Sequence, residues 1–227
     1  PASAGWIDEG TFRLPWESVA GFAPKGWEDA VMRWYRPFTY TTEWGGKTLA
    51  SRDIPQWCYD ADAWIRARHV ADDTLDAVRR AAALFGKGLG IHWYYWHNHP
   101  YDTHYPDYFP AQPRFAEMIR TAQSLGAHVT PYINGRLWDP AADSYKPDRG
   151  CDASCRKPDG TLYTEIYPTS KVLNTVTCPS TDIWHGKIIG LVDRLQRELG
   201  VDGIYIDQIA AAAPEPLSLI HISEPTR

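Results

Sequence analysis

The chain has 227 residues, of which 44% are hydrophobic and 22% charged, a composition typical of a globular protein with a sizeable core. Its formal net charge of -5 argues against nucleic acid as a partner, because nucleic-acid-binding proteins present a basic face. No run approaches the roughly 18 apolar residues of a membrane span, so no membrane-spanning segment is expected.

Residues 1–55 fit no strand–helix unit. The run 26–36 is expected to be helical, and we interpret 1–55 as a linker that could include the tail of an upstream β-sandwich domain. The main domain is therefore expected over residues 56–216.

Strands alternate with amphipathic helices throughout residues 56–216. Glycines at 86, 126 and 200 should end the helices, because glycine alone enters the left-handed conformation without steric cost. Strands are expected over 63–67, 89–96, 128–134 and 203–206, with helices over 72–85, 113–125 and 181–199 and a long irregular segment over 135–179. This alternation predicts an α/β fold with a parallel sheet.

Two architectures share such a sheet, the TIM (β/α)₈ barrel and the open doubly wound fold. A dinucleotide-binding doubly wound sheet has a glycine-rich loop after its first strand, whereas the glycine-rich run 86–90 precedes a strand. Long aromatic and polar loops after the strands favour the barrel. Because a full barrel takes roughly 250 residues, we expect 56–216 to be its N-terminal half, truncated after strand 4.

The two ends of the chain suggest a metagenomic gene fragment. Residues 217–227 resemble the conceptual translation of a sequencing-library adapter, and we expect this tail to be non-native. The chain starts at Pro1 rather than at a methionine. The sequence therefore indicates no compartment, and a secreted or periplasmic location is compatible with it.

Asp207 is the leading candidate for a catalytic carboxylate. It ends the last predicted strand, and barrel enzymes carry their catalytic groups at the C-terminal ends of strands. Strand alternation directs Gly203, Tyr205 and Asp207 toward the barrel axis. The alternative is a structural aspartate that caps the next turn, the role we expect for Asp202 at the opposite end of the strand.

Residues 182–207 resemble the fourth repeat of retaining glycoside hydrolase barrels of the α-amylase, α-glucosidase and α-galactosidase type. In those barrels, a hydrophobic-Asp-Gly-x-x-hydrophobic-Asp strand carries the nucleophile. Tyr205 stands where the α-amylase pattern has arginine, which favours the other branches. Segments 92–97 with 105–110, 131–139 and 200–212 more closely resemble an uncharacterised bacterial family, a domain of unknown function.

The resemblance implies a retaining glycoside hydrolase with a carbohydrate substrate and no cofactor, and Asp207 as nucleophile. Retaining hydrolysis needs a second carboxyl group about 5 Å away as proton donor. In the related barrels this donor follows a later strand, so we expect it beyond residue 216 and expect the fragment to be inactive. Glu165 and Asp139 are interpreted as solvated loop carboxylates. Neither the sugar, the stereochemical outcome nor the oligomeric state follows from the sequence.

Several polar and aromatic side chains follow the predicted strands and are candidates for binding a sugar. Flat rings stack on sugars, and the 11 tryptophans and 13 tyrosines suit either such a cleft or a large aromatic core. Arg136 could instead pair with Asp139, and Gln208 could satisfy backbone groups. The candidates are Trp96, His97, Asn134, Arg136, Trp138, Asp139 and Gln208.

Two other functions compete with glycoside hydrolysis. His97 and His99 have the His-x-His spacing of amidohydrolase barrels, and with Asp207 as a further ligand they would form the metal site of a metal-dependent hydrolase. We nevertheless expect no bound metal. A non-catalytic carbohydrate-binding barrel would use the same cleft. Cys151 and Cys155 lie in one polar loop, where they could form a disulfide or remain free.

Overall fold

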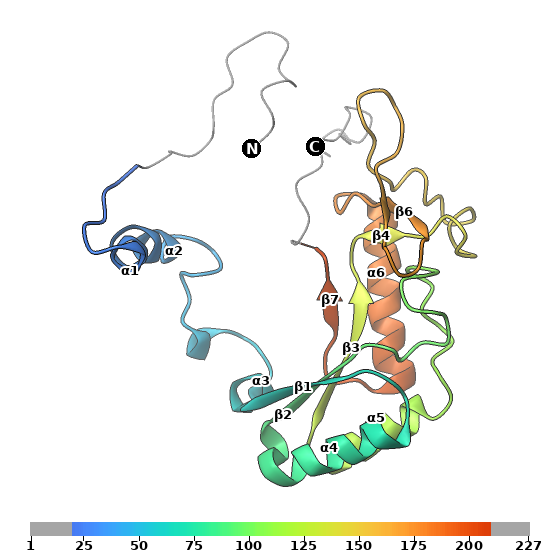
Figure 1. Cartoon of the computed structure of the whole chain (residues 1–227), viewed down its shortest axis with the longest axis horizontal. Helices are drawn as coiled ribbons and strands as arrows, with labels where there is room; N and C mark the ends of the chain where they lie inside the picture. The colour runs from blue at the N-terminus through green and yellow to red at the C-terminus, as the bar shows by residue number, and fades with distance from the viewer. Residues whose placement is uncertain (1–19, 210–227) are drawn as a thin grey trace. The chain divides into compact units, whose positions relative to one another are not determined.

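A computed structural model describes residues 20–209 of the chain (Figure 1). The chain divides into two compact units, Pro1–Cys58 and Tyr59–Arg227. The predicted β-sandwich tail falls largely on residues outside the described range, and the adapter-like tail 217–227 lies entirely outside it.

The first unit is helical where the structure describes it. The helical run comprises α1 (Trp27–Ala30), the π-helical η2 (Val31–Tyr35) and α2 (Arg36–Thr39). This confirms the helix expected over 26–36. Two short helices follow, the 3₁₀-helix η3 (Leu49–Ser51) and α3 (Gln56–Asp60).

The second unit is built on a parallel four-stranded sheet, as predicted. Its strands are β1 (Ala63–Ala67), β2 (Leu89–Trp93), β3 (His128–Asn134) and β7 (Tyr205–Asp207), in the order β1-β2-β3-β7. β2 ends at Trp93 rather than at the predicted Trp96, and β7 extends to Asp207. In the pairing of β3 with β7, Tyr132 lies opposite Tyr205 and Asn134 opposite Asp207.

Amphipathic helices connect these strands and lie along one face of the sheet (Figure 1). They are α4 (Asp72–Phe85) with the 3₁₀ turn η4 (Gly86–Gly88), α5 (Phe115–Ser124), and α6 (Asp182–Arg194) with its π-helical continuation η5 (Leu195–Leu199). Thr181 caps α6, its hydroxyl accepting a hydrogen bond from Trp184 N at 3.3 Å. Gly200 ends η5 in the left-handed conformation with φ of 66°.

The two faces of the sheet differ in chemistry. The helix-facing side contributes fully buried apolar residues such as Ile91, Val129 and Ile133. The opposite face is aromatic: the rings of Tyr94 and Tyr132 stack with centroids 5.0 Å apart, and Tyr205 adjoins both. Strand alternation therefore places Asp207, two residues after Tyr205, on the aromatic face.

Residues 135–179, here called the insertion, contain a small antiparallel sheet where an irregular segment was expected. Its strands are β4 (Leu137–Trp138), β5 (Thr164–Ile166) and β6 (Leu173–Val176), in the order β4-β6-β5. Strands of two to four residues are too short for a periodic pattern, so the sequence did not reveal them. The four cysteines form no disulfide in the described residues; Cys155 is buried and Cys151 exposed.

Within residues 20–209, no helix combines the length and the apolar character that crossing a bilayer requires.

Candidate functional site

Asp207 lies half-buried at the C-terminal end of β7. Its carbonyl oxygen accepts a hydrogen bond from Gly135 N at 2.9 Å, which ties the end of β7 to the residue that follows β3. Its Oδ1 accepts one from Gln208 N at 2.8 Å, the contact that a turn-capping aspartate would make. Oδ2 makes no hydrogen bond within residues 20–209, and so this oxygen is free for other chemistry.

Asn134 shapes the turn at the neighbouring end of β3. Its Oδ1 accepts hydrogen bonds from Arg136 N and Leu137 N, both at 2.9 Å. Its own backbone N donates to the hydroxyl of Tyr108, and its side chain is fully buried. With Oδ1 held by two donors, the amide orientation is fixed.

Arg136 forms an ion pair with Glu165 on β5, and its Nη2 lies 3.5 Å from Gln208 Oε1. The predicted alternative, a pair with Asp139, is therefore wrong. The prediction was wrong because the partner of Arg136, Glu165, lies 29 residues away in the sequence and is placed beside Arg136 by the insertion's sheet. The side chains of Arg136 and Glu165 are 12% and 34% exposed, so Glu165 is not the fully solvated carboxylate expected from the sequence.

Tyr167 joins the same group and was missed from the sequence. Burial, and then the nearby Glu165 carboxylate, raise the pKa of Tyr167 to about 12, a rise that the neighbouring amide groups of Gln208 and Asn134 partly offset. The phenol is therefore neutral near pH 7. The only sequence feature that pointed to Tyr167 and Glu165 was the length of the insertion.

We call Asn134, Arg136, Glu165, Tyr167, Asp207 and Gln208 the polar cluster. Within the described residues, Asn134 Nδ2, Arg136 Nε and Tyr167 Oη are buried and make no hydrogen bond of normal geometry. Buried polar atoms are nearly always hydrogen-bonded, so three such atoms in one cluster indicate a place for a polar ligand or water. The polar cluster thus combines carboxylates, hydrogen-bond donors and a neighbouring aromatic face.

Trp96 and Trp138 are fully buried. Trp96 Nε1 donates to Tyr132 O at 2.7 Å, and its ring stacks on Tyr108. Trp138 packs on Trp184. From the sequence, we expected these indoles to contact a sugar directly. Their burial does not match that expectation, because a fully buried ring packs against other side chains of the protein.

Asp139 holds two loops together. Its Oδ2 accepts a hydrogen bond from His104 N at 2.7 Å and its Oδ1 one from Ala141 N at 2.8 Å. The residue is only 2% exposed, so the interpretation of Asp139 as a solvated carboxylate was wrong. The His104 donor lies 35 residues away in another loop, and a sequence pattern does not reveal that the two loops meet.

The two histidines of the metal hypothesis have different surroundings. His97 is 2% exposed among aromatic rings, and burial, followed by the nearby His99, lowers its pKa to about 4. His99 instead stacks on His104, with ring centroids 4.4 Å apart. Among residues 20–209, no group of three or more His, Cys, Asp or Glu side chains is arranged to hold a metal ion.

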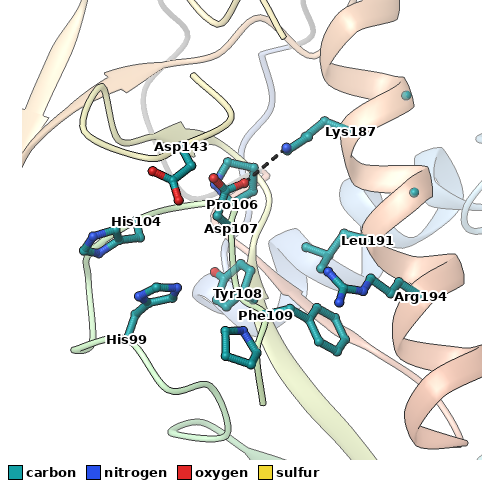
Figure 2. A pocket seen from close by; sticks show the side chains of 13 residues that line it. His99, His104, Pro106, Asp107, Tyr108, Phe109, Asp143, Lys187, Leu191 and Arg194 are labelled. Atoms are coloured by element: carbon teal, nitrogen blue, oxygen red, sulfur yellow. Dashed lines mark ion pairs between the residues drawn. The ribbon is translucent and has the colours of Figure 1, made fainter. Parts of the chain in front are cut away.

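His99 and His104 line a separate cavity of about 470 Å³ between the loop after β2 and α6 (Figure 2). Lys187 on α6 bridges this cavity's wall, pairing with Asp107 at 3.1 Å and Asp148 at 2.9 Å. None of the polar-cluster residues lines it.

The parallel sheet with helices on one face is similar in fold to part of a solved glycosidase. The solved α-N-acetylgalactosaminidase NagBb from Bifidobacterium bifidum, in complex with Gal-NHAc-DNJ, matches 83% of this chain and 34% of its own, with a TM-score of 0.60 and 17% identity. The ligand-free form of that protein matches with a TM-score of 0.56 over 78% of this chain and 34% of its own, also at 17% identity.

The chain belongs to the family described as a domain of unknown function, DUF6259, which matches residues 12–219. It is 55% identical over 214 residues to a "Putative glycoside hydrolase" of Bacteroides thetaiotaomicron, and 33% identical over 233 residues to "Putative glycoside hydrolase 22789" of Monosiga brevicollis. These matches cover 94% and 88% of this chain but only 32% and 19% of the relatives. The chain therefore spans a third or less of their length.

Proposed function

We propose that this chain is the nucleophile-bearing part of a longer retaining glycoside hydrolase and that Asp207 is the nucleophile. The observation that carries the proposal is the place of Asp207, half-buried at the C-terminal end of a parallel strand with one carboxylate oxygen unengaged in the described residues. The names of the relatives support the same reaction class.

In the proposed reaction, Asp207 attacks the anomeric carbon while a second carboxyl group protonates the departing oxygen. Water then hydrolyses the glycosyl ester, and the second group acts as base. Glu165 is engaged by Arg136, an arrangement that suits binding rather than proton donation. We therefore assign the proton donor to a later strand of the longer protein, beyond residue 216.

The remaining candidates have binding or supporting roles in this proposal. Asn134, Arg136 and Gln208 would hydrogen-bond to sugar hydroxyls, and the tyrosine rings beside them would pack on the sugar's apolar face. Trp96, His97, Trp138 and Asp139 would hold these groups in position from behind. The three unsatisfied buried atoms of the polar cluster support a polar ligand at this place.

We also propose that β1, β2, β3 and β7 are the first half of a (β/α)₈ barrel. The support is the parallel strand order, which follows the chain, and the placement of the connecting helices on one face. The similarity in fold to NagBb over 83% of this chain agrees with it.

The test uses the complete protein that contains this chain and a panel of aryl glycosides. Asp207→Asn keeps the shape of the side chain but removes the nucleophile, and should lower kcat by at least about a thousandfold. Asp193→Asn, an exposed residue on α6, serves as the matched control. Unchanged hydrolysis by Asp207→Asn would contradict the proposal, and sugar binding without any turnover would favour the non-catalytic carbohydrate-binding barrel.

A further inference from the structure

The charge of the polar cluster depends on three ionisable side chains. Asp207 and Glu165 are carboxylates, and Arg136 supplies the positive charge. Tyr167 is neutral, since burial raises its pKa to about 12. The cluster therefore carries one negative charge in excess.

Two further charged side chains contact tyrosines. The guanidinium of Arg66 lies 5.7 Å from the ring centroid of Tyr94, and Asp102 accepts a hydrogen bond from the Tyr105 hydroxyl at 2.8 Å. These two groups are opposite in sign. A negatively charged ligand would thus meet an unfavourable field at Asp207.

Glu165 also neutralises Arg136, the cation of the polar cluster that would attract such a ligand. A guanidinium is the preferred partner of a carboxylate because its N–H donors match the two oxygens. In this structure the carboxylate of Glu165 forms an ion pair with Nη2 of Arg136, and the side-chain oxygen of Gln208 lies near the same nitrogen. An acidic sugar would have to compete with Glu165 for Nη2 of Arg136, and the charge of Arg136 is already balanced by Glu165.

The arrangement is held by the backbone rather than by long free side chains. Glu165 lies in the middle of β5 and pairs with Asn174 of β6, and β6 in turn pairs with β4, which begins one residue after Arg136. The insertion's sheet therefore fixes both ends of the ion pair. This stiffness makes the pairing a fixed property of the site.

We infer that Glu165 is a specificity-determining residue, which, by engaging Arg136 beside Asp207, restricts the site to uncharged glycosides and excludes uronates. This inference rests on the proposed function for its substrate class. According to this inference, the insertion selects the sugar by its charge.

The test compares binding of galactose with galacturonate, and of glucose with glucuronate, to the complete protein that contains this chain, by isothermal titration calorimetry. Each pair differs in the oxidation state of C6 alone. In Glu165→Gln, Arg136 is released and one negative charge is removed, so the affinity for the uronate relative to the neutral sugar should rise about tenfold. Glu165→Asp, which keeps the charge, should retain the wild-type preference.

Glu198→Gln is the matched control, because Glu198 is an exposed carboxylate paired with Arg194 on the far end of α6. It should leave the uronate-to-neutral ratio unchanged. An equal ratio in Glu165→Gln and Glu198→Gln would overturn the inference, as would absence of binding by every sugar to both wild type and Glu165→Gln.

This result is separable from the test of the proposed function. A changed ratio in Glu165→Gln, together with unchanged hydrolysis by Asp207→Asn in the complete protein, would leave charge selection in place and refute the nucleophile. The reverse combination would refute charge selection alone.

Discussion

Asn134 shows how a single side chain sets the geometry at the end of a strand. Its Oδ1 accepts hydrogen bonds from two successive backbone donors, and its amide group is presented to the polar cluster. The residue is fully buried, so no water replaces these contacts if the side chain is removed. A change at this residue would therefore alter both the turn and the polar cluster.

Asn134→Ala should lower the free energy of unfolding by about 2–4 kcal/mol, because it leaves the N–H groups of Arg136 and Leu137 buried without an acceptor. Urea unfolding followed by tryptophan fluorescence measures this. The matched control is Asn98→Ala, at an exposed position, where a change below about 0.5 kcal/mol is expected. Similar losses in the two variants would contradict the role given to Oδ1.

His97 gives the fold a defined dependence on pH. Its pKa falls from 6.5 to about 4 on folding, because burial disfavours the imidazolium form. Between these values the unfolded chain binds a proton that the folded chain does not, so stability present above pH 6.5 is lost as the pH falls toward 4. The loss from this residue should reach about 2–3 kcal/mol near pH 4.5.

Urea unfolding near pH 7.5 and near pH 4.5 tests this dependence. His97→Phe should lose less stability on acidification than the wild type, by about that amount. The exposed His185, replaced in His185→Gln, should leave the wild-type dependence intact. Equal losses in His97→Phe and wild type would show that another group carries the effect.

The sequence led to the candidate residues that follow strands, but it gave Glu165 only as a solvated carboxylate and gave no indication of Tyr167. Asn134, Arg136, Asp207 and Gln208 lie at or just after the ends of β3 and β7, where a parallel sheet brings polar groups together. Glu165 and Tyr167 arrive through antiparallel pairing of short strands, which no local pattern encodes. The burial of Trp96 and Trp138 depends on how loops pack, and loops have no periodicity from which to predict it.

At the scale of elements, the main sheet and its helices follow from local patterns. The four parallel strands and three amphipathic helices were predicted because apolar periodicity and helix-ending glycines agree there. Strand ends shifted by a few residues, as β2 shows. The insertion differs, because its sheet forms only through contacts between distant segments such as β4 and β6.

Substituting two glycines by alanine distinguishes the effect of backbone conformation from the effect of steric contact with the added Cβ. An added Cβ would meet nothing within 4 Å at either Gly200 or Gly186, yet only Gly200 has a positive φ, of 66°. Gly200→Ala should therefore destabilise the chain by about 1–2 kcal/mol. Gly186→Ala, inside α6, should stabilise it by about 0.5–1 kcal/mol.

Thermal unfolding of both variants under one condition provides the measurement. Opposite shifts in Tm are expected, downward for Gly200→Ala and upward for Gly186→Ala. Shifts of the same sign would mean that conformation at the end of η5 does not decide the outcome.

At the scale of the whole molecule, the proposed half barrel has an unfilled inner face. Trp64 on β1 is 46% exposed there, and β1 is an edge of the described sheet. Exposed strand edges and rings favour self-association. The 227-residue chain expressed alone should therefore associate, as measured by size-exclusion chromatography with light scattering, and a monomer with one sharp cooperative melt would contradict the half-barrel proposal.

The most direct test of the central claim is to trap the glycosyl ester on the complete protein. A 2-deoxy-2-fluoro glycoside with an activated leaving group, of a configuration that the protein hydrolyses, slows breakdown of a covalent intermediate. The account predicts that the peptide containing Asp207 gains the mass of the fluorosugar, and that Asp207→Asn abolishes the label. Labelling of a different carboxylate, with Asp207 unmodified while hydrolysis proceeds, would contradict it.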